Sequence, residues 1–284
     1  YWSVGLRSRY NKFHKNINAN QLISVTQAEE SGLNKIDADY NDFTNQFYLQ
    51  TSFRRDFSLT LGLEHKRLEI TSETILPINQ EEETTFEKSD FISVYGKLKF
   101  DSFDNKYFPN NGFFFDSDFH WYLSSSDFNN NFSPFSIAKA DIAYAFSLTD
   151  KFSTVIGSEG GFKIGEDSNR SLNFALGGYG NDFINNFISF YGYDFIALTG
   201  NSFVKGYIDL DYEWLKKHHI KFSANYSNIG IDIFQDNEWI TSPDYSGYAI
   251  GYSLETFIGP IEAKYSWSPE VEKDIWFFNI GFWF

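Results

Sequence analysis

The sequence predicts an all-β protein that crosses a membrane as an antiparallel β-barrel. Apolar and polar residues alternate with a period of two along most of the chain. Aromatic residues are abundant, with 33 Phe, 18 Tyr and 7 Trp among 284 residues, yet the mean hydropathy is −0.38. Short connections also alternate with long polar ones. Together these features are typical of transmembrane strands, which need about 9–11 residues and face lipid on one side only.

Individual segments follow the alternating pattern closely. In 261–268, Ile261 and Tyr265 share one face while Glu262 and Lys264 share the other. Many segments exceed the 5–6 residues common in soluble sandwiches, so we favour a membrane barrel over a β-sandwich or a lipocalin-like barrel. About thirteen strands are predicted, at residues 1–10, 17–27, 43–54, 57–72, 91–103, 112–125, 136–149, 152–165, 201–216, 219–230, 246–258, 260–269 and 274–284.

The connections predict which end of the barrel is which. Short turns are expected at 54–56 and 149–151, whereas long polar segments occupy 28–42, 73–90, 126–135, 166–200 and 231–245. Outer-membrane barrels have short periplasmic turns and long extracellular loops. The polar faces then point into the lumen, where charges of both signs can pair across strands. Such a lumen is expected to be partly filled, and its charged residues are Lys97, Lys99, Asp209, Asp211, Glu213, Glu262 and Lys264.

Composition excludes several classes of function. The net charge of −15 argues against a nucleic-acid partner, which needs a basic surface. The chain has no cysteine, and we expect no metal and no cofactor. The run 37–42 (DADYND) carries possible calcium ligands but lacks the glycine and the distant glutamate of an EF-hand, so a solvated acidic loop is favoured. Neither G-x-S-x-G nor D-G-[GA] occurs, so no catalysis is expected from this chain.

Three stretches resemble the barrel of the BamA/TamA superfamily, the bacterial surface antigen type of outer-membrane protein. The stretch 101–112 (DSFDNKYFPNNG) is similar to a family turn whose residues are Asp101, Asp104, Asn105, Tyr107, Phe108, Pro109 and Gly112. The second stretch is FALGG at 174–178, followed by FYGYDF at 190–195. The third is the C-terminal strand, with Phe278, Asn279, Ile280, Gly281, Phe282 and Phe284. The resemblance implies a sixteen-stranded barrel in which the turn joins the eighth and ninth strands.

The resemblance also implies functional residues. In the family, a long sixth extracellular loop folds back into the lumen and usually carries an Arg at its tip. The matching tip is Phe190, Tyr191, Gly192 and Tyr193, so Tyr191 stands where the Arg would be. A tip without the Arg is similar to barrels fused to patatin-like phospholipases. The C-terminal residues Phe278, Ile280, Gly281, Phe282 and Phe284 match the signal that barrel assembly machinery reads.

These inferences predict a single outer-membrane barrel domain over 1–284. The chain contains no methionine, and Tyr1 begins within a strand-like pattern, so we expect further strands and a periplasmic or lipase domain upstream. The leading expectation is a barrel that anchors, and helps to translocate, a fused patatin-like lipase domain. The alternatives are an assembly or translocation factor for other proteins and a passive porin. Expected partners are outer-membrane lipid, lipopolysaccharide and the barrel assembly machinery.

Overall fold

The computed structural model describes residues 2–18, 22, 35–54, 56–73, 84–126, 128, 130, 132–165, 170–180 and 186–282. Twelve long strands form one antiparallel sheet. They are β1 (Trp2–Asn18), β2 (Lys35–Phe53), β3 (Phe57–Ser72), β4 (Thr84–Asp101), β5 (Gly112–Ser125), β6 (Phe135–Thr149), β7 (Phe152–Ile164), β11 (Ser202–Leu215), β12 (His218–Gly230), β13 (Tyr245–Thr256), β14 (Gly259–Ser268) and β15 (Val271–Ile280). No helix of the described residues is long and apolar enough to cross a membrane.

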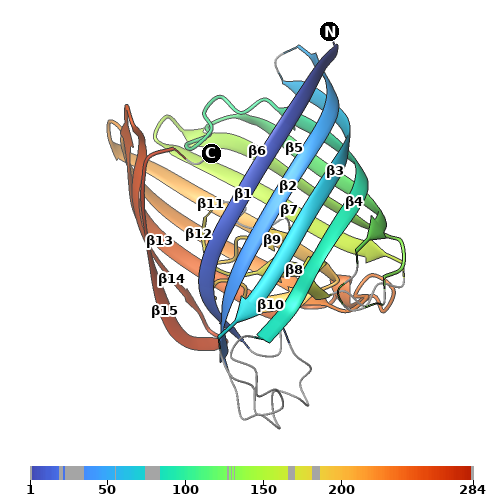
Figure 1. Cartoon of the computed structure of the whole chain (residues 1–284). Coiled ribbons are helices and arrows are strands. Elements are labelled where there is room, and N and C mark those ends of the chain that lie inside the picture. The colour runs from blue at the N-terminus through green and yellow to red at the C-terminus, as the bar shows by residue number, and fades with distance from the viewer. Residues whose placement is uncertain are drawn as a thin grey trace.

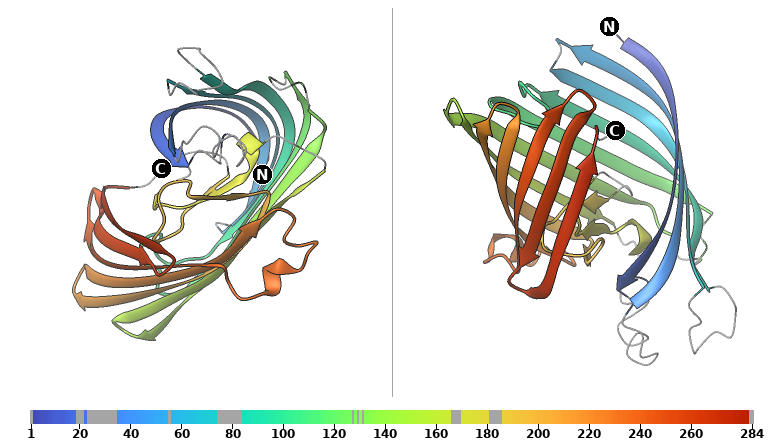
Figure 2. Two further views of the ribbon diagram at one scale, coloured as in Figure 1. Left: turned by 90° about the horizontal axis from the view of Figure 1, so that it is seen from below. Right: turned by 90° about the vertical axis from the view of Figure 1, so that its left-hand side faces the viewer.

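The sheet curls into a barrel wall that is open on one side (Figures 1 and 2). Each long strand pairs with its neighbours along the chain, except that β7 pairs with β11. Between those two strands lies a small second sheet of β8 (Phe174–Leu176), β9 (Phe187–Ile188) and β10 (Leu198–Gly200), in the order β10-β8-β9. Strands β1 and β15 end the sheet order and do not pair with each other among the described residues. The all-β barrel architecture predicted from the alternation is therefore confirmed.

The N-terminal strands differ from their predicted ranges. One continuous strand, β1, covers residues 2–10 of the strand predicted at 1–10, the connection expected after it and the first two residues of the strand predicted at 17–27. Of residues 19–34, only residue 22 is described. Strand β2 begins at Lys35 and β4 at Thr84, earlier than the predicted residues 43 and 91. The acidic run 37–42 is thus part of a strand and not a loop. Its carboxylates pair with neighbouring strands, Asp39 with His14 and Asp42 with Lys66.

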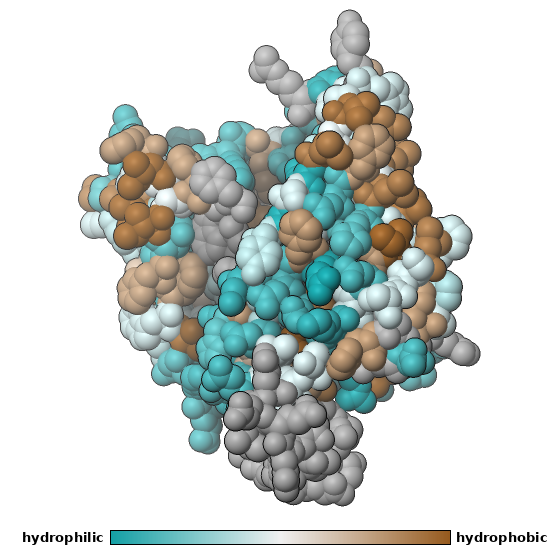
Figure 3. Space-filling model, in the orientation of Figure 1, coloured by the Kyte–Doolittle hydropathy of each residue, from teal (hydrophilic) through white to brown (hydrophobic). Residues whose placement is uncertain are grey.

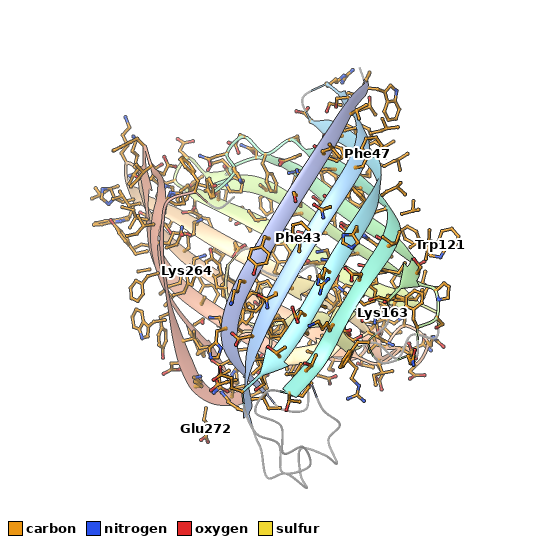
Figure 4. All side chains as sticks on the ribbon, in the orientation of Figure 1. Phe43, Phe47, Trp121, Lys163, Lys264 and Glu272 are labelled. Carbon is orange, nitrogen blue, oxygen red and sulfur yellow. The ribbon has the colours of Figure 1, made fainter. Side chains whose placement is uncertain are left out.

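The half of the wall nearest the short turns has an apolar exterior and a polar interior. On β3, Leu61 and Leu63 face outward and are about half exposed, whereas Glu64 and Lys66 face inward and are buried. Outward residues such as Phe47 and Trp121 point away from the wall (Figure 4). A barrel that crosses a bilayer needs such an apolar exterior where its wall meets the lipid.

The other half of the N-terminal wall has the opposite polarity. Further along β3, Arg67 points outward and forms an ion pair with Asp90, while Leu68 and Ile70 point inward and are buried. On the outer surface of this wall, apolar residues gather near the N-terminus and polar residues lie below them (Figure 3). The strands therefore continue past the bilayer and behave there like a soluble sheet. This inversion explains why alternation in the sequence located only part of β2 and β4.

Candidate functional site in the lumen

The site is built by the segment that connects β7 to β11 and lies inside the concave face of the wall (Figure 2, left). It contains a 3-10 turn (Arg170–Leu172) and the strands β8 (Phe174–Leu176), β9 (Phe187–Ile188) and β10 (Leu198–Gly200). Its apolar side chains form one buried cluster with the inward residues of the N-terminal strands. The cluster includes Tyr40, Leu68, Ile70, Phe91, Tyr122, Phe174, Leu176, Phe187, Phe190 and Ile196. We call residues 170–200 the lumen segment.

The tip of the lumen segment packs backbone against backbone on β13 and β14. Gly192 has φ +79°, and a Cβ there would lie 2.4 Å from the carbonyl oxygen of Trp267. A Cβ on Gly247 would lie 1.9 Å from the carbonyl oxygen of Tyr191. Only glycine fits at both positions because any side chain would separate the two backbones. The Tyr191 amide also donates a hydrogen bond to the Asn225 side chain at 2.8 Å.

A buried lysine on the wall holds the aromatic rings of the lumen segment. Lys264 of β14 donates to the Tyr179 hydroxyl at 2.5 Å, and its ammonium lies 3.9 Å from the Tyr179 ring centroid. The Tyr191 ring stacks on Tyr179 with centroids 5.5 Å apart, and lies 5.7 Å from the same ammonium. Glu262 lies 3.8 Å from Lys264 and partly balances its charge. The cation of this contact therefore comes from the wall and not from the tip.

The other two tip residues are anchored differently. Phe190 is 1% exposed and lies within the apolar cluster. The Tyr193 hydroxyl donates to Glu270 at 3.2 Å and accepts a hydrogen bond from Ser268 at 3.2 Å. Glu270 lies in the turn between β14 and β15 and also accepts a hydrogen bond from Ser246 at 2.6 Å. Burial disfavours ionisation of Glu270, but the hydrogen bonds from Ser246 and Ser268 outweigh burial and lower the pKa of this carboxyl.

The turn at 101–112 closes the opposite end of the lumen. The Asp104 carboxylate accepts backbone hydrogen bonds from Asn110 at 2.8 Å and Asn111 at 3.0 Å, which fixes the turn. The Asn105 side chain accepts two more, from Tyr107 at 2.9 Å and Phe108 at 3.2 Å. These bonds hold the Tyr-Phe-Pro stretch in a compact conformation rather than in a disordered loop.

Phe108 projects from this turn to the far wall. It is 4% exposed and stacks on His219 of β12 with ring centroids 4.1 Å apart. The Lys221 ammonium lies 4.1 Å from the Phe108 ring centroid and donates to the Tyr107 carbonyl at 2.8 Å. Asp211 accepts from His219 at 2.8 Å. The turn and β12 are therefore joined across the lumen by a cation–π contact and a hydrogen bond.

A cavity of about 520 Å³ remains between the lumen segment and this turn, and a second of about 410 Å³ lies between the lumen segment and the wall. Their walls carry lysines and carboxylates that pair with one another, including Lys97 with Asp118 at 2.6 Å and Lys205 with Glu159 at 3.2 Å. In the described part of the chain, no three His, Cys, Asp or Glu side chains group as a metal site would require. The arrangement can hold the lumen segment in place.

Comparison with known proteins identifies the family. A sequence profile of the OMP85 superfamily matches residues 1–284. The chain belongs to the OMP85 superfamily. No curated protein sequence matches it.

Several solved structures resemble this OMP85 chain. BamA from Haemophilus ducreyi lacking POTRA domains 1–3 matches with a TM-score of 0.66 and 12% identity, covering 97% of this chain and 57% of that one. CdiB from Acinetobacter baumannii matches with a TM-score of 0.58 and 14% identity, covering 97% of this chain and 46% of that one. CdiB from Escherichia coli matches with a TM-score of 0.58 and 14% identity, covering 94% of this chain and 47% of that one. The chain thus spans about half the length of these structures, and the likeness concerns the fold alone.

Membership of the OMP85 superfamily places the chain in the bacterial outer membrane. The long-loop end of the wall is then extracellular and the short-turn end periplasmic. Accordingly, the lumen segment enters from the extracellular side, and the 101–112 turn closes the periplasmic side.

The C-terminal strand of the OMP85 barrel faces lipid along one edge of the wall. Phe278 and Ile280 point outward and are 69% and 74% exposed. Gly281 has φ +106° and donates to the Pro260 carbonyl at 3.0 Å. The ring centroid of Phe282 lies 5.8 Å from that of Tyr107, so Phe282 adjoins the periplasmic turn. Phe284 lies outside the described residues, and its role as an assembly signal stays a prediction.

Several residues of the site were not singled out from the sequence. Asn225, His219, Lys221 and Gly247 contact the lumen segment or the turn, although long stretches of sequence separate them from their partners. Among the turn residues, the Asp101 carboxylate accepts a hydrogen bond from the Phe103 amide at 3.3 Å. Gly112 has φ +129°, and the backbone around it leaves no space for a side chain. Pro109 lines the larger cavity.

Proposed function

We propose that this chain is the membrane anchor of a larger protein and helps to export a fused N-terminal domain. The docked tip of the lumen segment carries this proposal. The tip reads Phe-Tyr-Gly-Tyr, and its Tyr191 contacts Lys264 where the family's tip would present an Arg. The resemblance of such a tip to patatin-linked barrels supports a lipase as the fused domain.

A closed lumen favours an anchor over a conduit. The lumen segment fills the extracellular half with a buried apolar cluster. The Phe108 turn joins opposite walls at the periplasmic end. Steady passage of solutes would require both elements to move, so we rank a passive porin last. The chain itself is proposed to have no catalytic role.

The complete reading frame tests the anchor proposal. A G-x-S-x-G motif and a D-G-[GA] motif upstream of residue 1 are the expected result. In cells, the lipase domain should then be accessible to external protease, and it should lose this accessibility when the barrel is deleted. An upstream region made only of periplasmic transport repeats would overturn the proposal.

The second candidate is a factor that assembles or translocates other proteins. The resemblance of three stretches of the sequence to the BamA/TamA superfamily supports this candidate. Depletion of the protein should then lower the amounts of other barrels in the outer membrane. Unchanged amounts of those barrels would exclude this role.

We also propose a correspondence with the sixteen-stranded barrels of the family. Eight long strands follow the 101–112 turn, from β5 to β15, and four precede it. If this turn joins the eighth and ninth strands, β15 is the sixteenth and β1 the fifth. The sequence predicted thirteen strands, whereas the described sheet has twelve, because β1 runs through the connection expected at 11–16.

A further inference from the structure

The connection between β12 and β13 lies outside the barrel wall. It contains a 3-10 turn, η3 (Glu238–Ile240), and contacts β7 instead of covering the lumen. Figure 2 (left) shows this orange segment outside the wall, whereas the lumen segment lies inside it. We call residues 231–244 the outer segment.

Hydrogen bonds from strand ends hold the outer segment in a defined conformation. The Asn201 side chain donates to the Asp232 carboxylate at 2.9 Å and accepts from the Asp232 amide at 2.8 Å. The Ile233 amide donates to the Ser202 hydroxyl at 3.0 Å, and Ile233 is 2% exposed. Such bonds fix one end of the segment on β11.

A single asparagine fixes the rest of the outer segment. The Asn228 side chain donates to the Glu238 carbonyl at 2.7 Å and accepts from the Asp244 amide at 2.7 Å. These two hydrogen bonds fix the outer segment relative to the end of β12. The exposed apolar side chains of the outer segment therefore stand on a backbone that these hydrogen bonds fix in position.

The outer segment exposes a set of large apolar side chains. Ile231 is 74% exposed, Ile240 65% and Trp239 42%. Two of them adjoin the outward face of β7, Ile231 beside Ile164 and Trp239 through Phe234. The Phe234 ring lies 5.5 Å from the ring of Phe162, an outward residue of β7, and 5.9 Å from the Trp239 ring.

A groove of about 760 Å³ separates the outer segment from the end of β7. Phe162, Ile164, Ile231 and Phe234 are its apolar lining residues. Polar residues of the segment, among them Asp232, also border it. An apolar groove that opens beside a lipid-facing strand and has polar groups nearby fits a hydrocarbon chain whose head group remains at the membrane surface.

We propose that the outer segment is an outer-leaflet anchor that holds one lipid acyl chain in this groove. Ile231, Trp239 and Ile240 enter the edge of the hydrocarbon layer. Acidic residues such as Asp236 and Glu238, which are exposed, remain among the head groups and water. Trp239 then takes the place that aromatic residues occupy in interfacial girdles, with its ring at the depth where hydrocarbon meets water.

Site-specific labelling tests the proposal in the full-length protein. This chain has no cysteine, so one introduced cysteine can carry a bimane label once any cysteine elsewhere in the protein is replaced by serine. The variants are Ile231→Cys in the groove, Ile240→Cys at the apolar edge and, as the matched control, Ser242→Cys in the same segment. Each is reconstituted in phospholipid vesicles containing doxyl-labelled acyl chains, and its folding is checked by heat-modifiable gel migration.

The labels at 231 and 240 should be quenched several-fold more by doxyl lipid than the label at 242, and several-fold less by aqueous iodide. Equal iodide quenching at all three positions would overturn the anchor. Lipid quenching at 240 without quenching at 231 would overturn the bound acyl chain. Because a cysteine could disturb folding, Trp239→Phe gives a second measurement. It should reduce the lipid quenching of intrinsic fluorescence, and an unchanged signal would contradict the proposal.

Discussion

Replacing Gly247 with alanine should detach the tip of the lumen segment. The new Cβ would lie 1.9 Å from the Tyr191 carbonyl oxygen, whereas real Cβ contacts essentially never fall below 3.0 Å, so the tip must retreat by at least 3.0 − 1.9 = 1.1 Å. The Tyr191 amide would move with it, lengthening its 2.8 Å hydrogen bond to Asn225 beyond bonding range.

The loss of docking free energy in Gly247→Ala has two contributions, the steric overlap of the new Cβ and the lost hydrogen bond to Asn225. Overpacking a tight contact costs about 1–3 kcal/mol, and a lost hydrogen bond costs about 0.5–1.5 kcal/mol. A total of about 2–4 kcal/mol would favour the detached tip by roughly thirty-fold or more, since about 1.4 kcal/mol is a factor of ten. The effect concerns the docking of the segment, so the barrel wall should remain folded.

Limited proteolysis from the extracellular side measures this shift. In intact cells the lumen segment of Gly247→Ala should be cleaved at least ten-fold faster than in the unaltered protein, while heat-modifiable migration stays normal. Gly206→Ala is the matched control, because a Cβ at Gly206 on β11 would meet no atom within 4 Å. Equal cleavage rates in Gly247→Ala and Gly206→Ala would refute the docking geometry.

Three further changes test other contacts. Lys264→Gln removes the buried ammonium between Tyr179 and Tyr191 and should increase channel openings in planar bilayers, whereas Lys88→Gln, at an exposed ion pair with Glu69, should not. Phe108→Ala should destabilise the barrel by about 3–5 kcal/mol, the usual cost of removing a buried phenyl ring, as measured by the temperature of heat-modifiable unfolding; a change below 1 kcal/mol would contradict the contact with His219. Deletion of Phe284 should lower the amount of protein in the outer membrane, and normal amounts would exclude its role as an assembly signal.

The sequence predicted the membrane-facing part of the fold well, because lipid and lumen impose opposite polarity on alternate residues. The outward positions of Trp276, Phe278 and Ile280 followed from that alternation. In the extracellular half of the N-terminal wall, parts of β2 and β4 escaped prediction because the polarity of the wall is reversed there. There Leu68 and Ile70 pack on the lumen segment, and Arg67 faces water.

The candidate site was predictable only in part. The tip residues Phe190–Tyr193 could be located by resemblance, and Lys264 was expected to face the lumen. Their contact could not be foreseen, since the residues that receive the tip lie on β12, β13 and β14. The contact of Phe108 with His219 likewise depends on the curvature of the whole sheet, which brings the 101–112 turn to β12 and which no local pattern in the sequence encodes.

Photo-crosslinking at position 191 tests the central claim, that the tip of the lumen segment is docked on the inner wall, most directly. A photoreactive phenylalanine analogue would replace Tyr191 in the full-length protein, and intact cells would be irradiated and the crosslinked peptides identified by mass spectrometry. The account predicts intramolecular crosslinks to β12, β13 and β14, within residues 218–268. Crosslinks within the lumen segment, such as to Tyr179, are also expected from the stacked rings. The absence of any crosslink to β12, β13 or β14 would contradict the account.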